Sequence, residues 1–253
     1  MILRRLGNKS KIAKEIQKHF PPHKIYIEPF FGAGGMFFNK PKAKYNFLND
    51  IDSDVFNLFM VVMNQKEELE NLFLQMPESE QLFKYWKTNN ETEPIKKALR
   101  FLFLSNYGYM GSPNTIHFTI SNTTQILIKN LEKTQNFMFG CKIMNADFRD
   151  VFKKISFKEN NIKDTFIYAD PPYLNTNNNY SNSFTKDDSI DLFNSLQETG
   201  CKWAMSEFDN EFILNQAKER NLNVYIIGER QNMKNRKTEI LITNYKTSQI
   251  SLF

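Results

Sequence analysis

The chain has 253 residues, of which 41% are hydrophobic and 14% aromatic, so it can bury a sizeable core and is not an intrinsically disordered protein. No apolar stretch of signal-peptide or membrane-spanning length follows the first residues, which predicts a cytoplasmic protein without a membrane partner. The formal net charge of +5 is compatible with a polyanionic partner but does not require one.

The first part of the chain alternates strands and helices. Ser10 is the expected N-cap of a helix that Pro21 ends, because proline cannot continue a helix. The elements expected next are a short strand over 24–31, a glycine-rich turn over 32–35, an apolar helix from residue 36, a strand over 45–48 and a helix capped by Asp52 or Ser53. This order is typical of the opening of a Rossmann-like unit.

Residues 64–138 interrupt the alternation. They contain helical patterns and polar loops, without the apolar run of a buried strand. The segment 96–104 predicts a helix, and 106–124 predicts a loop rich in Asn, Gly, Ser, Thr and aromatic residues. We therefore expect residues 1–63 and 139–253 to form one domain, and residues 64–138 to be an insertion with a task of its own.

The alternation resumes in the second half of the chain. Strands are expected over 142–146, 166–169, 202–206, 224–227 and 239–245, of which the last closes the sheet. Between them we expect a polar loop over 174–186, a helix capped by Asp187 or Asp188, a helix over 210–220 and a basic loop over 230–237. The predicted fold is α/β, a Rossmann-like sheet with helices on both faces and an inserted, mainly helical region.

Acidic residues follow three successive predicted strands, namely Asp50, Asp147 and Asp170. Because parallel strands bring their carboxyl ends to one edge of the sheet, these acids are expected at the edge where ligands bind. An acid after the second strand commonly accepts hydrogen bonds from ribose hydroxyls, and glycines in the first turn let a ligand approach the backbone closely. The pattern predicts a nucleoside cofactor.

The glycine spacing distinguishes between such cofactors. A dinucleotide requires G-x-G-x-x-G, whereas this turn reads Gly-Ala-Gly-Gly and follows Glu28, whose charge would oppose phosphates. S-adenosylmethionine has no phosphate and carries a sulfonium cation, so an acid-lined crevice suits it better. A nicotinamide-dependent dehydrogenase on the same kind of sheet is the alternative. The two cysteines, Cys141 and Cys201, lack metal-type spacing and are expected to be free thiols, so no metal site is predicted.

The strand over 166–169 leads directly into Asp170-Pro171-Pro172-Tyr173. The two prolines restrict φ and stiffen the turn that carries the acid and the ring. A carboxylate, a rigid pair of carbonyls and an aromatic plane suit a flat base that carries an exocyclic amine. An ordinary proline turn at the end of a strand is the alternative for this motif taken alone.

These segments together resemble those of the D12 class, or Dam-type, DNA adenine-N6 methyltransferases, from end to end and in the family's order. The matching segments are Gly7-Asn8-Lys9, Ile27-Glu28-Pro29-Phe30-Phe31-Gly32-Ala33-Gly34-Gly35, Leu48-Asn49-Asp50, Asp147-Phe148, Asp170-Pro171-Pro172-Tyr173 and Leu241-Ile242-Thr243-Asn244-Tyr245. One departure is that residues 107–114 lack the arginine that many relatives reading GATC carry there, so GATC is not assumed as the target.

The resemblance implies a Rossmann-like, S-adenosylmethionine-dependent methyltransferase that methylates N6 of an adenine flipped out of duplex DNA. Asp170 and the Pro171 carbonyl would accept the amine hydrogens, and Tyr173 would stack on the base. The residues implied to bind S-adenosylmethionine are Lys9, Glu28, Pro29, Phe30, Phe31, Gly32, Ala33, Gly34, Gly35, Asn49, Asp50, Asp147, Phe148 and Asp170. The sulfonium is already activated, so this chemistry needs no metal.

The same resemblance makes residues 64–138 a target-recognition insertion, in which 106–124 would read bases. The predicted contacts to double-stranded DNA are Lys9, Tyr107, Tyr109, Asn114, Tyr180, Arg230, Lys234, Arg236 and Lys237, with His117, Asn122 and Phe184 as further candidates. A cognate restriction endonuclease is a possible protein partner. The target could instead be RNA adenine or cytosine N4, although cytosine-N4 enzymes more often have serine where Asp170 stands. A DNA-binding protein with a dead site is disfavoured by the intact motif.

Overall fold

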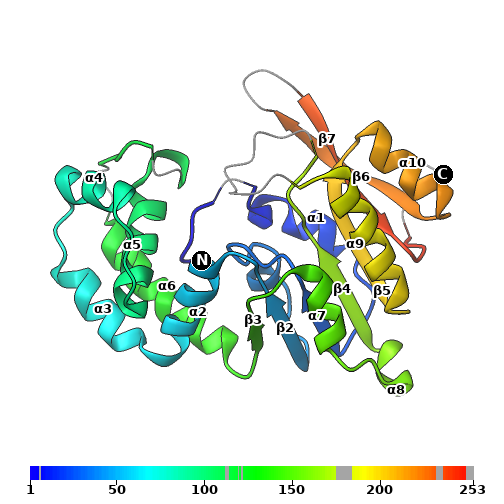
Figure 1. Cartoon of the computed structure of the whole chain (residues 1–253), viewed down its shortest axis with the longest axis horizontal. Helices are drawn as coiled ribbons and strands as arrows, with labels where there is room; N and C mark the ends of the chain where they lie inside the picture. The colour runs from blue at the N-terminus through cyan, green and yellow to red at the C-terminus, as the bar shows by residue number, and fades with distance from the viewer. Residues whose placement is uncertain are drawn as a thin grey trace.

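The computed structural model describes residues 1–5, 7–111, 114–118, 120, 122–174, 184–231 and 236–248. Within these residues seven strands form one sheet at the centre of the molecule (Figure 1). The strands are β1 (Ile25–Glu28), β2 (Tyr45–Asn49), β3 (Lys142–Met144), β4 (Thr165–Ala169), β5 (Lys202–Phe208), β6 (Asn223–Gln231) and β7 (Arg236–Thr243).

The strand order is β3-β2-β1-β4-β5-β7-β6. The first five strands pair in parallel, and β7 runs antiparallel to both of its neighbours, β5 and β6. The chain builds outward from β1 to β3 and then returns to β4 on the other side of β1. The strand order reverses between β1 and β4, and open α/β sheets bind ligands outside the carboxyl ends of the strands at such a point. The predicted Rossmann-like sheet is confirmed.

Helices cover both faces of the sheet, as predicted. The apolar core on one face joins Tyr26 and Tyr168 to α1 (Ala13–Gln17) and α2 (Ser53–Asn64). The core on the other face joins Ile27 and Trp203 to α7 (Phe148–Lys154), α9 (Lys186–Glu198) and α10 (Glu211–Glu219). All five residues of β4 are buried, because helices cover this parallel strand from both sides. A short helix, α8 (Glu159–Ile162), precedes β4.

Residues 64–138 are helical in the described part, as the sequence predicts. Figure 1 shows their helices gathered beside the sheet, namely α3 (Lys66–Gln75), α4 (Glu80–Thr88), α5 (Pro94–Tyr107) and α6 (Thr123–Met138). A single 3-10 turn, η3 (Tyr109–Gly111), follows α5. The apolar core of this region continues through α2 to the sheet, so packed side chains as well as the chain connect it to the sheet. Among the described helices, none combines the length and apolarity needed to cross a membrane.

Two expectations near the N-terminus are wrong. Ser10 is not a cap, because the Asn8 side chain accepts the Ser10 backbone N–H and starts a 3-10 turn, η1 (Lys9–Lys11). The helix expected from residue 36 is only a 3-10 turn, η2 (Phe37–Asn39). Lys40 is extended, with φ −116° and ψ 158°, as residues before a proline generally are, and Pro41 follows it.

Two expectations in the second half also need correction. Thr185, and neither Asp187 nor Asp188, is the N-cap of α9, where Asp188 completes a capping box. At both ends of the expected basic loop 230–237 the described residues are strand, since Arg230 pairs with Lys237 and Gln231 with Arg236, while 232–235 lie outside the described residues. The last strand in the sequence, β7, is not an outermost strand of the sheet, because it lies between β5 and β6.

Candidate active site

The predicted site acids lie along one edge of the sheet. Glu28 is the last residue of β1, Asp50 follows β2, Asp170 follows β4, and Asp147 comes after β3 as the N-cap of α7. Because β1 to β4 are parallel, their carboxyl ends share this edge, which includes the point where the strand order reverses. The topology brings these acids to one crevice although 142 positions separate Glu28 from Asp170 (170 − 28) in the sequence.

Asp50 organises the glycine-rich turn. Its Oδ2 accepts the Gly32 backbone N–H at 2.6 Å, and its Oδ1 accepts the Asp52 N–H at 2.9 Å. Gly32 adopts φ 53° and Gly34 φ 71°, a region that side-chain-bearing residues rarely enter. Burial raises the pKa of the Asp50 carboxyl above its ordinary value, and the two backbone hydrogen bonds act against that rise. The acid and the turn therefore form one unit.

Asn49 clamps the loops around this unit. Its side-chain N–H groups donate to the carbonyls of Pro29 and Ala146, both at 2.9 Å, and its Oδ1 accepts the Ala146 N–H at 3.0 Å. The residue is 1% exposed. Asn49 therefore fixes the ends of β1, β2 and β3 relative to one another, a role that the sequence did not distinguish from cofactor contact.

Asp147 and Phe148 lie in a charged and aromatic cluster. The Asp147 side chain accepts the Arg149 backbone N–H, and the Arg149 guanidinium forms ion pairs with Asp147, Asp188 and Asp191. The Phe148 ring lies 5.5 Å from that of Phe30 and 6.1 Å from that of Phe184. The sequence analysis did not single out Arg149. Its position two residues after Asp147 could have predicted an ion pair between the two.

Glu28 is a buried acid with a tyrosine partner. The side chain is 2% exposed and its Oε2 accepts the hydroxyl hydrogen of Tyr26 at 2.8 Å. Burial raises the pKa of Glu28 well above its ordinary value, which favours the protonated form. The expected repulsion of phosphates by a Glu28 carboxylate therefore stays a prediction, and the choice of cofactor rests on other features.

Two residues of the Asp-Pro-Pro-Tyr motif contact a buried ammonium group. Lys9 Nζ lies 2.9 Å from Asp170 Oδ1 and 3.2 Å from Glu239 Oε1, and 4.3 Å from the centre of the Tyr173 ring. The Tyr173 hydroxyl donates to Glu239 Oε1. The Asp170 side chain is 20% exposed, whereas that of Lys9 is 4% exposed. The Asp170 carboxyl group is therefore partly exposed, whereas the lysine that pairs with it is buried.

This position of Lys9 does not agree with the expected contact to DNA phosphates, because the ammonium already lies between two carboxylates inside the protein. Tyr107 is likewise not on the surface. It is 3% exposed, and its hydroxyl contacts Glu78 and Thr124, so it offers no stacking plane to DNA. Tyrosine and lysine occur both in protein cores and on surfaces. Only the tertiary packing shows which of the two environments a given residue has.

The other predicted DNA contacts are placed as follows. Tyr109 is 59% exposed and its ring meets that of His117 edge-on, and Asn114 is exposed nearby in sequence. Lys237 Nζ lies 5.1 Å from the Phe208 ring, next to the site. Asn122 is the N-cap of α6. Tyr180 and Lys234 lie outside the described residues, and of Arg230 and Arg236 only the backbone is described.

Gly35 determines how the N-terminal segment reaches the site. A Cβ atom at this position would lie 2.0 Å from Asn8 Oδ1 and 2.9 Å from the Lys9 backbone nitrogen. Asn8 cannot move freely, because its Oδ1 also accepts the backbone N–H and hydroxyl of Ser10. The absence of a side chain at residue 35 thus allows Lys9 to enter the site.

We expect Gly35→Ala to lower the free energy of unfolding by about 1–3 kcal/mol, since the added methyl group must displace backbone. Urea denaturation followed by circular dichroism measures this. Gly228→Ala is the matched control, because Gly228 has no atom within 4 Å of the new methyl group and no positive φ. Equal stability of the two variants would show that Gly35 is not in tight contact with the N-terminal segment.

Glu207 is another buried acid near the site, and the sequence analysis did not identify it. It lies on β5, is 1% exposed, and accepts backbone N–H groups from Phe208 at 2.8 Å and Leu174 at 3.4 Å. Burial raises the pKa of Glu207 to about 8, and the two backbone hydrogen bonds act against this rise. Glu207 holds the residue that directly follows Tyr173. The sequence holds no clear signal for it, because an acid at the end of the predicted strand 202–206 does not show which groups surround it.

The raised pKa of Glu207 predicts a pH dependence of stability. The carboxyl ionises near 4.5 when unfolded and near 8 when folded, so its contribution to stability is complete below pH 4.5 and lost as the pH rises through 8. Over that window it lowers the free energy of unfolding by up to about 1.4 kcal/mol per pH unit. We expect Glu207→Gln to flatten the slope in denaturation at several pH values. The control Glu198→Gln, at an exposed residue of α9, should keep the wild-type slope.

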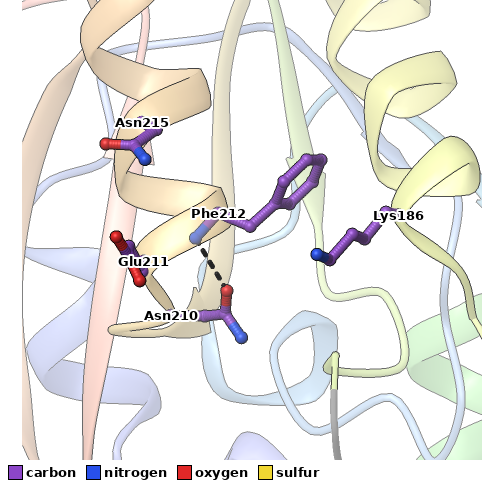
Figure 2. Close-up of a pocket in the computed structure, with 5 residues that line it drawn as sticks. All are labelled: Lys186, Asn210, Glu211, Phe212 and Asn215. Atoms are coloured by element: carbon purple, nitrogen blue, oxygen red, sulfur yellow. Dashed lines mark hydrogen bonds between the residues drawn. The ribbon is translucent and has the colours of Figure 1, made fainter.

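A surface depression of about 400 Å³ lies apart from these residues (Figure 2). It is lined by Lys186, Asn210, Glu211, Phe212 and Asn215. The Asn210 side chain accepts the Phe212 N–H as the N-cap of α10, and the Lys186 ammonium lies 5.1 Å from the Phe212 ring. These polar groups thus already have partners within the protein, and the depression contains no residue of the predicted site.

Comparison with known proteins gives consistent matches. The model of the D12 class N6 adenine-specific DNA methyltransferase family matches residues 6–234. The DNA adenine methylase of Salmonella typhi is 28% identical over 187 residues, which are 66% of this chain and 62% of the relative, so the match spans less than two thirds of that protein. The type II methyltransferase M.MjaIII of Methanocaldococcus jannaschii is 26% identical over 94% of this chain and 96% of its own.

A search of solved structures finds a putative methyltransferase from Streptococcus mutans, SMU.1697c, in complex with SAH. It covers 93% of this chain and 97% of its own, with 9% sequence identity and a TM-score of 0.43.

Proposed function

Since the chain belongs to the D12 class N6 adenine-specific DNA methyltransferase family, we propose that it transfers a methyl group from S-adenosylmethionine to N6 of an adenine flipped out of a specific sequence in duplex DNA. One observation supports this proposal above the others. Asp170 and Tyr173 leave β4 at the point where the strand order reverses, on the same sheet edge as Asp50 and its glycine-rich turn. Base and cofactor would meet at this edge.

The residues of the crevice fit S-adenosylmethionine, which when bound supplies an electrophilic methyl group on a sulfonium cation. At Gly34 a Cβ would lie 2.4 Å from Phe38 and 2.9 Å from Phe31, so this part of the turn packs against the two rings, whereas the space beside Gly32 is open. Asp50 offers a carboxylate for ribose hydroxyls. Asp147 offers a carboxylate for the amine of the cofactor's adenine, and the neighbouring Phe30 and Phe148 offer an apolar wall for its ring.

The motif residues suit the acceptor base. The lone pair of the adenine amine is delocalised into the ring, so the amine must be held close to the methyl group and in line with the bond that breaks. Asp170 and the Pro171 carbonyl would accept its two hydrogens and favour a more tetrahedral nitrogen as positive charge develops. Tyr173 would contact the ring of the base. A base within the duplex cannot reach this position, so flipping is required, at a cost of a few kcal/mol.

The helical region beside the sheet would read the sequence. We propose that residues 64–138 are the target-recognition insertion and that residues 1–63 and 139–253 carry the chemistry. The exposed side chains of Tyr109, Asn114 and His117 support this division, because they offer stacking planes and polar groups beyond the end of α5. A restriction endonuclease with the same recognition sequence is the proposed protein partner.

The experiment is transfer of tritiated methyl groups from S-adenosylmethionine to unmethylated duplex DNA and, separately, to RNA, followed by nucleoside analysis. We expect label in N6-methyladenine from DNA only. Label in RNA alone, or in N4-methylcytosine, would replace the proposed acceptor. A thermal melt with S-adenosylmethionine and with NADH separates the methyltransferase from a dehydrogenase, since only the true cofactor raises the melting temperature.

A further inference from the structure

Glu239 is a buried acid for which the proposed chemistry has no role yet. It is 1% exposed and lies near the start of β7, next to the apolar residues 240–242. Because β7 is antiparallel to β5, its beginning lies at the sheet edge where β4 and β5 end, with Glu239 paired in register with Phe208. The fold thus brings a residue from the C-terminal part of the chain to the Asp-Pro-Pro-Tyr motif.

The contacts of Glu239 connect it to both ends of the motif. Its Oε1 lies 3.2 Å from Lys9 Nζ, which in turn lies 2.9 Å from Asp170 Oδ1. The same Oε1 accepts the hydroxyl hydrogen of Tyr173. Phe208, opposite Glu239 in the register, meets the Tyr173 ring edge-on at 4.6 Å. Glu239 therefore touches the tyrosine directly and the aspartate through one lysine.

Asp170 and Glu239 share one ammonium group, because Lys9 Nζ lies within ion-pair distance of both carboxylates. An ammonium held by one carboxylate alone would pair with it more completely and compete with any other hydrogen-bond donor that approaches it. Sharing therefore keeps Asp170 a stronger acceptor than it would be in a simple ion pair.

We infer that Glu239 is a positioning residue of the active site, which divides the Lys9 ammonium between two carboxylates and fixes the ring of Tyr173 through its hydroxyl. The inference rests on the proposed function, because the group positioned is the adenine amine that Asp170 receives. Glu239 does not touch the base. It acts through Lys9 and Tyr173, and so its loss affects the rate of transfer more than the binding of either substrate.

The test is Glu239→Gln, which preserves the shape of the side chain and an acceptor for the tyrosine hydroxyl but removes the charge. We expect kcat for methyl transfer to unmethylated DNA to fall by about 10–100-fold, as for a misplaced reacting group, with KM for S-adenosylmethionine within about twofold of wild type. Glu229→Gln is the matched control, at an exposed glutamate of the same hairpin. It should retain the wild-type kcat.

A double-mutant cycle with Lys9→Met distinguishes positioning from a structural role. If Glu239 acts through Lys9, the double variant should be no slower than Lys9→Met alone, because the second change removes a partner already lost. Multiplying losses, or a wild-type kcat in Glu239→Gln, would overturn the inference. If Glu239→Gln does not fold, Tyr173→Phe tests the hydroxyl contact, and an unchanged kcat there overturns it as well. Absence of transfer by the wild-type protein would instead contradict the proposed function.

Discussion

Asp170→Asn is expected to reduce methyl transfer by at least about 10³-fold, since the variant loses the charge that stabilises the developing cation. The amide also presents a donor where the adenine amine needs an acceptor. Binding of S-adenosylmethionine, measured by calorimetry, should remain detectable because the glycine-rich turn and Asp50 are untouched. The fold should persist, since Lys9 keeps Glu239 as an ion-pair partner.

The matched control for this variant is Asp164→Asn. Asp164 directly precedes β4, as Asp170 directly follows it, so the two acids lie at opposite edges of the sheet. Asp164 pairs with Lys24 at a partly exposed site. Its replacement should leave transfer unchanged. Wild-type transfer by Asp170→Asn would refute the role assigned to the motif, and equal losses in both variants would point to a general effect on folding.

Asp50→Asn is expected to weaken binding of S-adenosylmethionine by about 10–100-fold, the range for losing a hydrogen bond to a charged group. Two effects act together. The ribose hydroxyls lose a charged acceptor, and the Gly32 N–H loses the carboxylate that holds the turn at 2.6 Å. At saturating cofactor, kcat should fall much less than the affinity does, because the acceptor site is intact.

Titration calorimetry of Asp50→Asn beside Asp54→Asn checks this expectation. Asp54 lies four residues further along the chain and pairs with Lys97. It should bind the cofactor as the wild type does. A normal dissociation constant for Asp50→Asn, with transfer lost, would move Asp50 from cofactor binding to catalysis.

Gly35 shows the difference between a glycine that the local sequence explains and one that only a tertiary contact explains. The sequence places a glycine-rich turn after β1, because glycine allows the positive φ seen at Gly32 and Gly34. Gly35 itself has no positive φ. It is required for another reason, because Asn8 and Lys9 pack against its backbone. These two residues lie 26 or more positions earlier in the sequence (35 − 9). No local rule could distinguish the two reasons.

Lys9 and Tyr107 show the same limit for side chains. Both belong to residue types that are common on DNA-binding surfaces, and both are buried here with specific polar partners. Glu207 and Glu239 were passed over because an acid within or beside an apolar strand says little until its neighbours are known. The β5–β7–β6 arrangement that brings Glu239 to Tyr173 depends on which strands pair.

What the residues alone established is the kind of fold and the positions of the strand-end motifs, since apolar periodicity, glycine and proline act within a few neighbours along the chain. The sheet order, the antiparallel last strand and the lysine held between Asp170 and Glu239 followed only from folding. The lysine site joins segments at least 69 positions apart (239 − 170), and the free energy of burying charges depends on partners that only three-dimensional packing supplies.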